Sequence, residues 1–285
     1  MSLLALAVGG RGLVDPEEPV LHVDDEAFLR SRAAFETTRV YGGAPFKLDE
    51  HLARLEGSAA RVEIGPIDTG ELARLAGLAL EAAAAPDAVL RLFVTPGRDG
   101  SGRPTEVAMV STLPLGLEEL RARGAKLVSI QLGLDPGLRA SSPWLLGGVK
   151  STSYAVNMAA EAEAKRRGAD DAVFLGAGDV VLEGPVTNVW WRLENVLYTP
   201  ALELGILAGV TRATLVEEAA AAGYEVREGV FPLEHMAGAE EAFTSSSIRE
   251  VMPVVELDGQ AVGAGGPGPA AAELQRRLRA CASSP

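Results

Sequence analysis

The sequence predicts a two-domain α+β protein, and three observations support that prediction. The chain has 285 residues, which suits one or two domains of roughly 150 residues each. Short strand-like segments mix irregularly with a few helical patterns, which is typical of α+β domains and not of a regular βαβ repeat. Pro114-Leu115-Gly116 resembles a short linker, so we expect domains over residues 1–115 and 116–285.

The first domain is expected to be a small α/β unit. Residues 35–41 have strand composition and meet a Gly42-Gly43 turn, and Asp49 is a plausible N-cap for the helix that follows. In that helix Leu52, Leu55 and Ala59 recur at helical spacing. The expected elements are strands at 1–10, 35–41, 46–48, 89–95 and 107–113 and helices at 50–61 and 69–84.

The second domain is expected to contain more strands than helices. A Gly at position 168 closes a helical pattern that ends in basic residues, as helix C-termini often do. The expected strands are 125–132, 171–175, 180–182, 188–192, 196–199, 241–244 and 254–257. The expected helices are 151–168, 211–223 and 269–281, and residues 134–148 form an irregular segment.

Composition excludes several classes of function. With 26 basic and 39 acidic residues the net charge is −13, which argues against a nucleic-acid partner. No apolar run approaches the roughly 18 residues of a membrane span. The single Cys281 excludes a disulfide framework, and the three histidines show no metal-ligand spacing, so we expect no metal. The sequence thus predicts a soluble, cytoplasmic enzyme.

Lys150 is the best candidate for a catalytic lysine. It is one of four lysines and lies between an apolar Gly-rich segment and a Ser-Thr-Ser cluster that opens a helical pattern. An amine in such a setting has a lowered pKa, which a nucleophilic or Schiff-base lysine needs. A solvated lysine at a helix start is the alternative interpretation.

Three further segments suit a phosphorylated aromatic cofactor. Glu183 lies between an apolar strand and a Gly-Pro turn, where a carboxylate needs a cationic or hydrogen-bonding partner. Residues 205–212 place Gly and Thr at a helix start, and residues 244–247 are a run of hydroxyl side chains; both can supply donors to a phosphate. With Lys150 they describe a pyridoxal 5'-phosphate (PLP) site. Taken singly, each segment has a structural interpretation as a surface turn, a helix cap or a serine loop.

This combination of motifs resembles the fold-type IV PLP enzymes, which comprise the class IV aminotransferases and the related aminodeoxychorismate lyases. The resemblance spans residues 24–260. Its motifs are Phe35-Glu36-Thr37-Thr38-Arg39, Asp49-Glu50-His51-Leu52-Ala53-Arg54-Leu55, Gly148-Val149-Lys150, Glu183-Gly184 with Asn188, Gly209-Val210-Thr211-Arg212, and Ser246-Ser247 before Glu250-Val251-Met252-Pro253-Val254.

The resemblance implies a role for each matching residue. Lys150 would form the Schiff base with PLP and move protons, and Glu183 would hold the ring nitrogen protonated. Leu207 would lie under the ring and Tyr154 near its phenolic oxygen. The residues implied to bind the phosphate are Arg54, Val210, Thr211, Ser246 and Ser247.

The resemblance also implies a fold and an assembly. The fold would be a small α/β domain followed by a larger domain built on a β-barrel-like sheet. The family is dimeric, so a homodimer is expected. The substrates would be a small-molecule amino donor and a 2-oxo acid acceptor, with no nucleic acid and no membrane as partner.

The reaction type is left open between two outcomes. Class IV aminotransferases move an amino group from an amino acid or amine to a 2-oxo acid, and this is the leading interpretation. Phe35, Thr37 and Arg39 on the 35–41 strand are similar to the pattern of aminodeoxychorismate lyases, which release pyruvate and 4-aminobenzoate. Arg30, Arg32 and Arg98 are candidates for binding a substrate carboxylate, and solvated arginines are the alternative. A non-catalytic relative is a remote third interpretation.

Overall fold

The computed structural model describes residues 1–98 and 100–283. The chain divides into two compact units. Unit 1 comprises Met1–Leu115 together with Val149–Tyr154, and unit 2 comprises Gly116–Gly148 and the chain from Ala155 onward. One boundary falls between Leu115 and Gly116, whereas Val149–Tyr154, which we expected in the second domain, belongs to unit 1.

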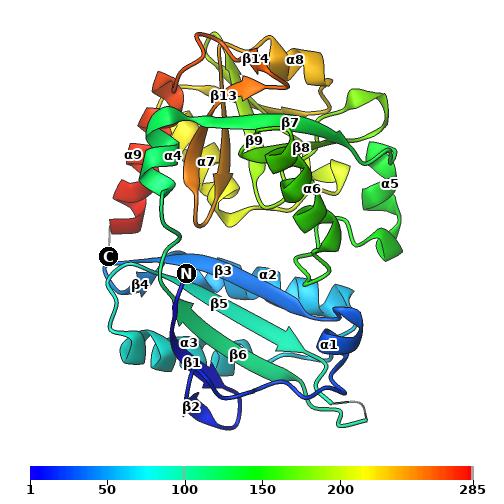
Figure 1. Cartoon of the computed structure of the whole chain (residues 1–285), viewed down its shortest axis with the longest axis vertical. Helices are drawn as coiled ribbons and strands as arrows, with labels where there is room; N and C mark the ends of the chain where they lie inside the picture. Colours follow the sequence, from blue (N-terminus) through cyan, green and yellow to red (C-terminus); the bar gives the residue numbers. More distant parts are fainter. Residues whose placement is uncertain (99, 284–285) are drawn as a thin grey trace. The chain divides into compact units, whose positions relative to one another are not determined.

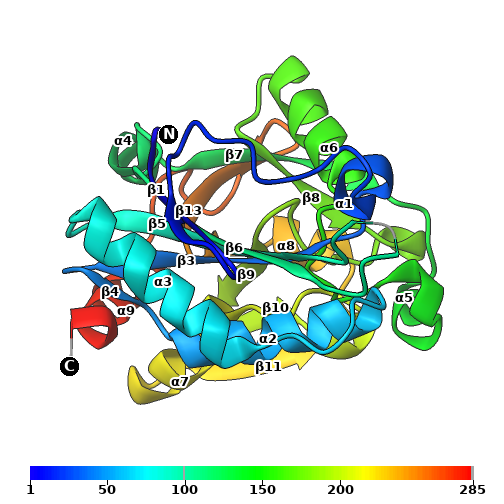
Figure 2. The same cartoon turned by 90° about the horizontal axis from the view of Figure 1, so that it is seen from below.

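Unit 1 is a six-stranded antiparallel sheet with strand order β2-β1-β6-β5-β3-β4. Two helices, α2 and α3, run side by side over one of its faces (Figure 2). The elements are β1 (Leu3–Val8), β2 (Gly12–Val14), α1 (Glu26–Arg30), β3 (Ala34–Tyr41), β4 (Ala44–Pro45), α2 (Leu48–Arg61), α3 (Thr69–Ala83), β5 (Ala88–Thr95) and β6 (Thr105–Ser111).

The core of unit 1 follows from the periodicities read in the sequence. Leu52, Leu55 and Ala59 form the apolar stripe of α2 and are all buried, as the helical spacing predicted. They pack with Ala34 and Val40, which alternate along β3 and so point to the same face of the sheet. The opposite face of β3 therefore carries Phe35, Thr37, Arg39 and Tyr41.

Unit 2 is built on an eight-stranded mixed sheet with strand order β11-β10-β9-β12-β13-β7-β8 and β14 paired to β13. Figure 1 labels β7, β8, β9 and β13 of this sheet. Its helices α6, α7 and α9 pack against this sheet. The elements are α4 (Leu117–Arg123), β7 (Ala125–Gln131), α5 (Pro136–Ser141), η1 (Pro143–Leu145), α6 (Ala155–Arg166), β8 (Asp171–Leu175), η2 (Ala177–Asp179), β9 (Asn188–Leu193), β10 (Val196–Pro200), η3 (Leu202–Leu204), α7 (Val210–Ala221), β11 (Glu225–Gly229), α8 (Leu233–Ala237), β12 (Glu241–Ser246), β13 (Glu250–Leu257), β14 (Gln260–Ala261) and α9 (Pro269–Ser283).

The segment 180–183 links the two ends of this strand order. On one side Leu182 and Glu183 exchange backbone hydrogen bonds with Phe174 of β8. On the other side the Val181 N–H donates to the carbonyl of Phe231, two residues beyond β11. A sheet whose ends are connected in this way has the barrel-like character expected of the larger domain. The two sheets with their helices confirm the α+β class.

Several local predictions were wrong. The strand expected at 46–48 lies at Ala44–Pro45 instead, and Leu48 already begins α2. The strand expected at 180–182 is formed as isolated bridges at Val180 and Val181.

The helix expected from Ser151 begins at Ala155, because residues 151 and 152 instead pair with the start of β3. Asp49 does not cap α2. Lys47 occupies the N-cap with a left-handed backbone, φ +50°, so Asp49 falls in the first turn, where its charge suits the helix dipole.

Two classes of feature are missing from the part of the chain that the structure describes. None of its helices combines the length and the apolarity that crossing a bilayer requires. No group of three or more His, Cys, Asp or Glu side chains among residues 1–98 and 100–283 is arranged to hold a metal ion.

Candidate active site

The segment with Lys150 pairs with the start of β3 through backbone hydrogen bonds, as a short additional strand would. The Lys150 carbonyl accepts a hydrogen bond from the Phe35 N–H at 3.1 Å, and the Thr152 N–H donates to the Ala33 carbonyl at 3.0 Å. The Lys150 N–H in turn donates to Ser58 Oγ on α2 at 3.2 Å. The backbone of Lys150 is thereby fixed on two sides, which limits where its amine can lie.

The Lys150 amine lies over an aromatic ring of β3. Its Nζ is 4.5 Å from the centroid of Phe35. Phe35 also stacks on Phe93 of β5 and contacts the edge of the Tyr154 ring, with centroids 5.5 and 5.3 Å apart. The structure thus brings Lys150, Phe35 and Tyr154 together, three of the residues named from the sequence.

Thr37 and Arg39 share the face of β3 that carries Phe35. Arg39 is buried, and its guanidinium lies 5.0 Å from the centre of the Tyr41 ring. Thr37 pairs across the sheet with Arg91 of β5. The period-2 alternation of the strand therefore lines this face with two aromatic side chains, Phe35 and Tyr41, one hydroxyl and one cationic side chain.

On the other face of β3, Glu36 joins two side chains of α2 in what we call the anchor cluster, Glu36, His51 and Arg54. Arg54 binds Glu36 with two parallel hydrogen bonds, Nε to Oε1 and Nη2 to Oε2, each 2.7 Å long. His51 Nδ1 is 2.7 Å from Glu36 Oε2. His51 and Arg54 are three residues apart on α2 and so reach the same carboxylate.

The protonation states of the anchor cluster follow from its burial. Burial by itself would raise the pKa of Glu36, but the hydrogen bonds from Arg54 and His51 outweigh it and hold that pKa at about 2. Burial lowers the pKa of His51 more than Glu36 raises it, so His51 is neutral. Because an ionised Glu36 only accepts, Nδ1 of His51 carries the hydrogen and Nε2 keeps the lone pair.

In unit 2, Glu183 follows the segment that links the sheet ends. Its Oε2 accepts the Leu207 N–H at 2.9 Å, and its Oε1 lies 3.4 Å from Arg139 Nη1. Gly184 allows the turn that follows, because a Cβ there would lie 2.3 Å from Thr187 Oγ1. The carboxylate is therefore held in place by one backbone donor and one guanidinium.

The Leu207 peptide is held from two sides. Its N–H donates to Glu183, and its carbonyl accepts a 3.0 Å bond from Asn188 Nδ2. Asn188 also approaches Gly209 so closely that a Cβ at Gly209 would lie 2.2 Å from Asn188 Oδ1. Glycine at position 209 is thus required by the close approach of Asn188.

Two sources of hydrogen-bond donors meet at this end of the unit 2 sheet. The helix α7 starts at Val210 and Thr211, and its N-cap Gly209 has no side chain to cap the first-turn amides. Ser246 ends β12, and Asn188 pairs with the neighbouring Ser245 across the sheet. This register places the turn with Ser246 and Ser247 at the same end of the sheet as Asn188 and hence as the start of α7.

These residues fit a phosphorylated pyridine. An uncapped N-terminus of a 12-residue helix favours an anion, and hydroxyl side chains add donors to it. A carboxylate held by a neutral amide and a long contact to Arg139 can accept from a ring N–H. Taken by itself, unit 1 carries a fixed amine at Lys150 and a guanidinium at Arg54, whose orientation Glu36 sets.

Three arginines named from the sequence have ion-pair partners elsewhere. Arg30 and Arg32 both pair with Glu26, at 3.5 and 2.6 Å, and Arg98 pairs with Asp24 at 3.1 Å. Their assignment to a substrate carboxylate stays a prediction.

Sequence reasoning missed the partners of the charged site residues. Glu36 and His51 were seen as parts of motifs, without a function. The signal was present, because a glutamate inside an apolar strand needs a buried partner and His51 and Arg54 share one face of a helix. Arg139 gave no signal, since it lies in a segment that we expected to be irregular.

Comparison of the sequence with known proteins places these observations in a family. Residues 33–257 match the model of the amino-transferase class IV family. The chain is 32% identical over 258 residues to the bifunctional aminodeoxychorismate lyase / D-amino acid transaminase of Mycobacterium tuberculosis, covering 87% of this chain and 89% of that protein. It is 28% identical over 274 residues to the D-alanine aminotransferase of Bacillus licheniformis, covering 94% and 93%.

A solved structure agrees with the sequence matches. A hypothetical aminotransferase from Mycobacterium tuberculosis in a PLP-bound form superposes with a TM-score of 0.92 and 30% identity, covering 98% of this chain and 99% of the other. The form of that protein with α-ketoglutarate and PMP bound gives a TM-score of 0.91 at 30% identity, covering 97% and 98%. The chain belongs to the class IV aminotransferase family.

Proposed function

We propose that the protein is a PLP-dependent aminotransferase that moves an amino group between an amino acid and a 2-oxo acid, with Lys150 as its catalytic base. The observation that carries the proposal is the fixed Lys150. Its backbone is bound to β3 and α2, and its amine lies over Phe35 on the face of β3 that also carries Thr37 and Arg39. PLP, when bound, supplies an aldehyde that condenses with amines and a ring that accepts electrons from the substrate Cα.

The residues of unit 1 would bind, orient and move protons. Lys150 Nζ would take the proton from the substrate Cα and deliver one to the C4′ carbon of the cofactor, so it would act as base and then as acid. Arg54 binds the phosphate with a guanidinium whose plane is set by Glu36. Tyr154, whose ring meets that of Phe35 edge to face, would donate to the phenolic oxygen of the cofactor.

The residues of unit 2 would hold the ring and the phosphate. Glu183 keeps a proton on the pyridine nitrogen, and the Leu207 N–H keeps Glu183 in place. The Leu207 side chain packs under the ring. Val210, Thr211, Ser246 and Ser247, which we call the phosphate cradle, donate to the phosphate from the uncapped start of α7 and from the β12–β13 turn.

The family members compared above suggest a first substrate pair. D-Alanine is the donor to test first, because one similar relative is a D-alanine aminotransferase and another is in part a D-amino acid transaminase. The acceptor is 2-oxoglutarate, which a structural neighbour binds. Purified protein with both compounds should form pyruvate and glutamate in equal amounts, and chiral chromatography gives the hand of the glutamate. Pyruvate formed without an equal amount of glutamate would contradict amino transfer, and absence of both products would exclude D-alanine and 2-oxoglutarate as the substrate pair.

Aminodeoxychorismate lyase activity is the second candidate function. The observation that favours it is Thr37, which shares the lysine-bearing face of β3 with Phe35 and Arg39 and matches the lyase pattern. A Thr37→Gly variant separates the two reactions. If the lyase reaction is native, wild-type protein releases 4-aminobenzoate from aminodeoxychorismate and the variant loses this reaction while retaining amino transfer.

The assembly and location are also part of the proposal. A homodimer is supported by apolar side chains left exposed at and before α1, where Val23, Phe28 and Leu29 are 59–77% exposed. Sedimentation equilibrium should give twice the chain mass, and a monomer would contradict it. A cytoplasmic location is supported by the single Cys281, which excludes the disulfide framework typical of secreted proteins, and is tested by fractionation of the cells that make the protein.

A further inference from the structure

Glu250 occupies an unusual position at the β12–β13 turn. It begins β13 directly after this turn, and its side chain is completely buried. Its backbone is left-handed with φ +55°, a region that residues with a Cβ rarely adopt. Such a conformation persists only where the surroundings determine it, and positions of this kind concentrate at functional sites.

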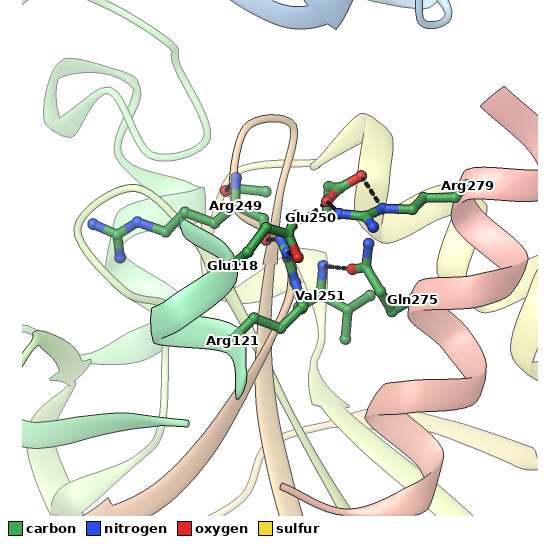
Figure 3. Close-up of polar contacts among 8 residues, drawn as sticks. Glu118, Arg121, Arg249, Glu250, Val251, Gln275 and Arg279 are labelled. Atoms are coloured by element: carbon green, nitrogen blue, oxygen red, sulfur yellow. Dashed lines mark hydrogen bonds and ion pairs between the residues drawn. The ribbon is translucent and has the colours of Figure 1, made fainter. Parts of the chain in front are cut away.

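Two arginines from different helices meet on the Glu250 carboxylate (Figure 3). Arg121 of α4 donates from Nη2 to Oε2 at 2.9 Å. Arg279 of α9 donates from Nε to Oε1 at 3.1 Å and from Nη2 to Oε2 at 2.8 Å. Glu118 pairs with both arginines, at 2.7 and 2.6 Å, so that two carboxylates balance two guanidinium groups.

The same side chains bind the backbone on both sides of Glu250. Arg121 donates to the Arg249 carbonyl at 2.8 Å and to the Val251 carbonyl at 3.1 Å. Gln275 of α9 accepts the Val251 N–H at 2.9 Å. We call Arg121, Glu250, Gln275 and Arg279 the turn clamp. It ties the β12–β13 turn to α4 and α9 through six hydrogen bonds, whose geometry tolerates little displacement.

The clamped turn is the one that carries the serines of the phosphate cradle. Ser246 lies directly opposite Glu250 in the strand ladder, and its Oγ accepts the Arg249 N–H at 3.2 Å. We infer that Glu250 is a positioning residue for phosphate recognition, which acts by fixing the turn with Ser246 and Ser247. This inference rests on the proposed function of those serines.

Charge repulsion explains why removing the Glu250 carboxylate should displace the β12–β13 turn. Removing the charge of Glu250 leaves Arg121 and Arg279 close together without the buried carboxylate that they share, while the exposed Glu118 still pairs with both. The two guanidinium groups then repel each other, and solvent screens this repulsion only in part, because the Arg121 side chain is largely buried although Arg279 is 41% exposed. Arg121 moves and releases the Arg249 and Val251 carbonyls, so the serines lose their fixed positions.

Glu241 provides a matched control in the same hairpin. It is also a buried carboxylate that ties the sheet to α9, because it accepts the Ala270 and Ala271 N–H groups at 3.1 and 2.7 Å. It lies at the opposite end of β12 from Ser246, five residues or roughly 17 Å away along the strand. Glu241→Gln should weaken the first turn of α9 and leave Gln275 and Arg279, four or more residues further along the helix, in place.

The test compares the binding of PLP with that of pyridoxal, which lacks the phosphate, to apoprotein of the wild type, Glu250→Gln and Glu241→Gln. The PLP-to-pyridoxal affinity ratio measures phosphate recognition, and thermal unfolding of each apoprotein measures stability. We expect the ratio to fall about tenfold or more in Glu250→Gln and to stay within about twofold of wild type in Glu241→Gln. Loss of stability in Glu250→Gln with an unchanged ratio would overturn the inference and leave Glu250 a structural residue.

Two further measurements keep the outcome decisive. If Glu250→Gln does not fold, Gln275→Met removes the acceptor of the Val251 N–H at similar volume, and an unchanged ratio in that variant would overturn the inference. Ser246→Ala with Ser247→Ala tests the proposed function separately. If that double variant keeps the wild-type ratio, the phosphate cradle is wrong and the inference falls with it; if only the Glu250 and Gln275 variants keep it, the cradle stands and the clamp alone is wrong.

Discussion

Two buried glutamates organise the two units in different ways. In unit 1, Glu36 binds Arg54, and Arg54 is itself the side chain proposed to bind phosphate. In unit 2, Glu250 binds Arg121 and Arg279, neither of which has a proposed role toward a ligand, and through them it fixes a backbone turn. The same buried ion pairing thus orients a side chain in one unit and a stretch of backbone in the other.

The difference between Glu36 and Glu250 shows that a buried charge can position either a charged side chain or a segment of backbone. A carboxylate that directly orients a guanidinium sets its plane by two parallel bonds. Backbone amides and hydroxyls, as at the start of α7 and in the β12–β13 turn, have no charge to orient and depend on the rigidity of the chain that carries them. The comparison therefore predicts which substitutions alter stability, which alter recognition and which alter neither.

The largest effect on activity is expected at Lys150, whose amine neither of the two glutamate-centred clusters can replace. Lys150→Ala should lower the rate of amino transfer by about 10³-fold or more, because no other amine is fixed on β3. Lys126→Ala is the control, since that lysine is half exposed and pairs with Glu256. Steady-state assays of both variants check this, and a Lys150→Ala enzyme with wild-type turnover would refute the assigned base.

The next largest effect is expected from breaking the anchor cluster. Glu36→Gln leaves the Arg54 charge without its buried counter-ion, and should lower the free energy of unfolding by roughly 3 to 5 kcal/mol. Urea unfolding of the apoprotein measures this. A loss below about 1 kcal/mol would show that Arg54 reaches solvent and that Glu36 does not fix it.

The acid dependence of stability sharpens the same point. Because the pKa of Glu36 is lowered from 4.5 to about 2, its stabilisation is fully present above pH 4.5 and is lost as the pH falls toward 2. The loss amounts to about 3 kcal/mol. Unfolding curves at pH 5, 4 and 3 should converge for wild type and Glu36→Gln, and parallel curves would exclude an ionised Glu36.

A smaller effect is expected at a glycine of unit 2. Gly209→Ala places a Cβ 2.2 Å from Asn188 Oδ1, so the Leu207 contact must shift at a cost of about 1 to 3 kcal/mol. Gly77→Ala in α3 is the control, because its Cβ meets open space, and it should gain up to about 1 kcal/mol. Thermal unfolding compares the two, and equal signs would contradict the close approach.

The smallest effect is expected at a surface arginine. Arg98 pairs with Asp24 and both are largely exposed, so Arg98→Ala should change stability by at most about 0.5 kcal/mol. The KM for each substrate decides its function. An unchanged KM assigns Arg98 to the surface, and a KM raised about tenfold would assign it to the substrate carboxylate.

Much of the architecture could be predicted from local patterns. The apolar spacing of Leu52, Leu55 and Ala59 identified the buried face of α2, and the strand composition of residues 35–41 identified β3. The strand pairing of residues 151 and 152 could not be predicted, because it depends on the start of β3, more than one hundred residues away. The prediction of Asp49 as the N-cap of α2 failed for a similar reason. The chain turns after β4 through the left-handed backbone of Lys47, and the helix therefore begins earlier than expected.

The candidate site could be predicted in part. Lys150 and Glu183 stood out because each combines a reactive group with an apolar setting. Arg54 was named only through the family resemblance, since an arginine on an amphipathic helix is ordinarily solvated. Glu250 had no local signal at all, because its partners lie on α4 and α9, which the sequence alone does not bring together.

The most direct test of amino transfer is a single half-reaction. Purified PLP-loaded protein is titrated with D-alanine alone, and then with L-leucine, L-glutamate and an (R)-arylamine, with no acceptor present and with the visible spectrum recorded. We predict that one donor converts the yellow form to the colourless pyridoxamine form with one oxo product per site, which for D-alanine is pyruvate. If no donor changes the spectrum while aminodeoxychorismate yields pyruvate and 4-aminobenzoate with the yellow form retained, the protein is a lyase and the proposed aminotransferase is contradicted.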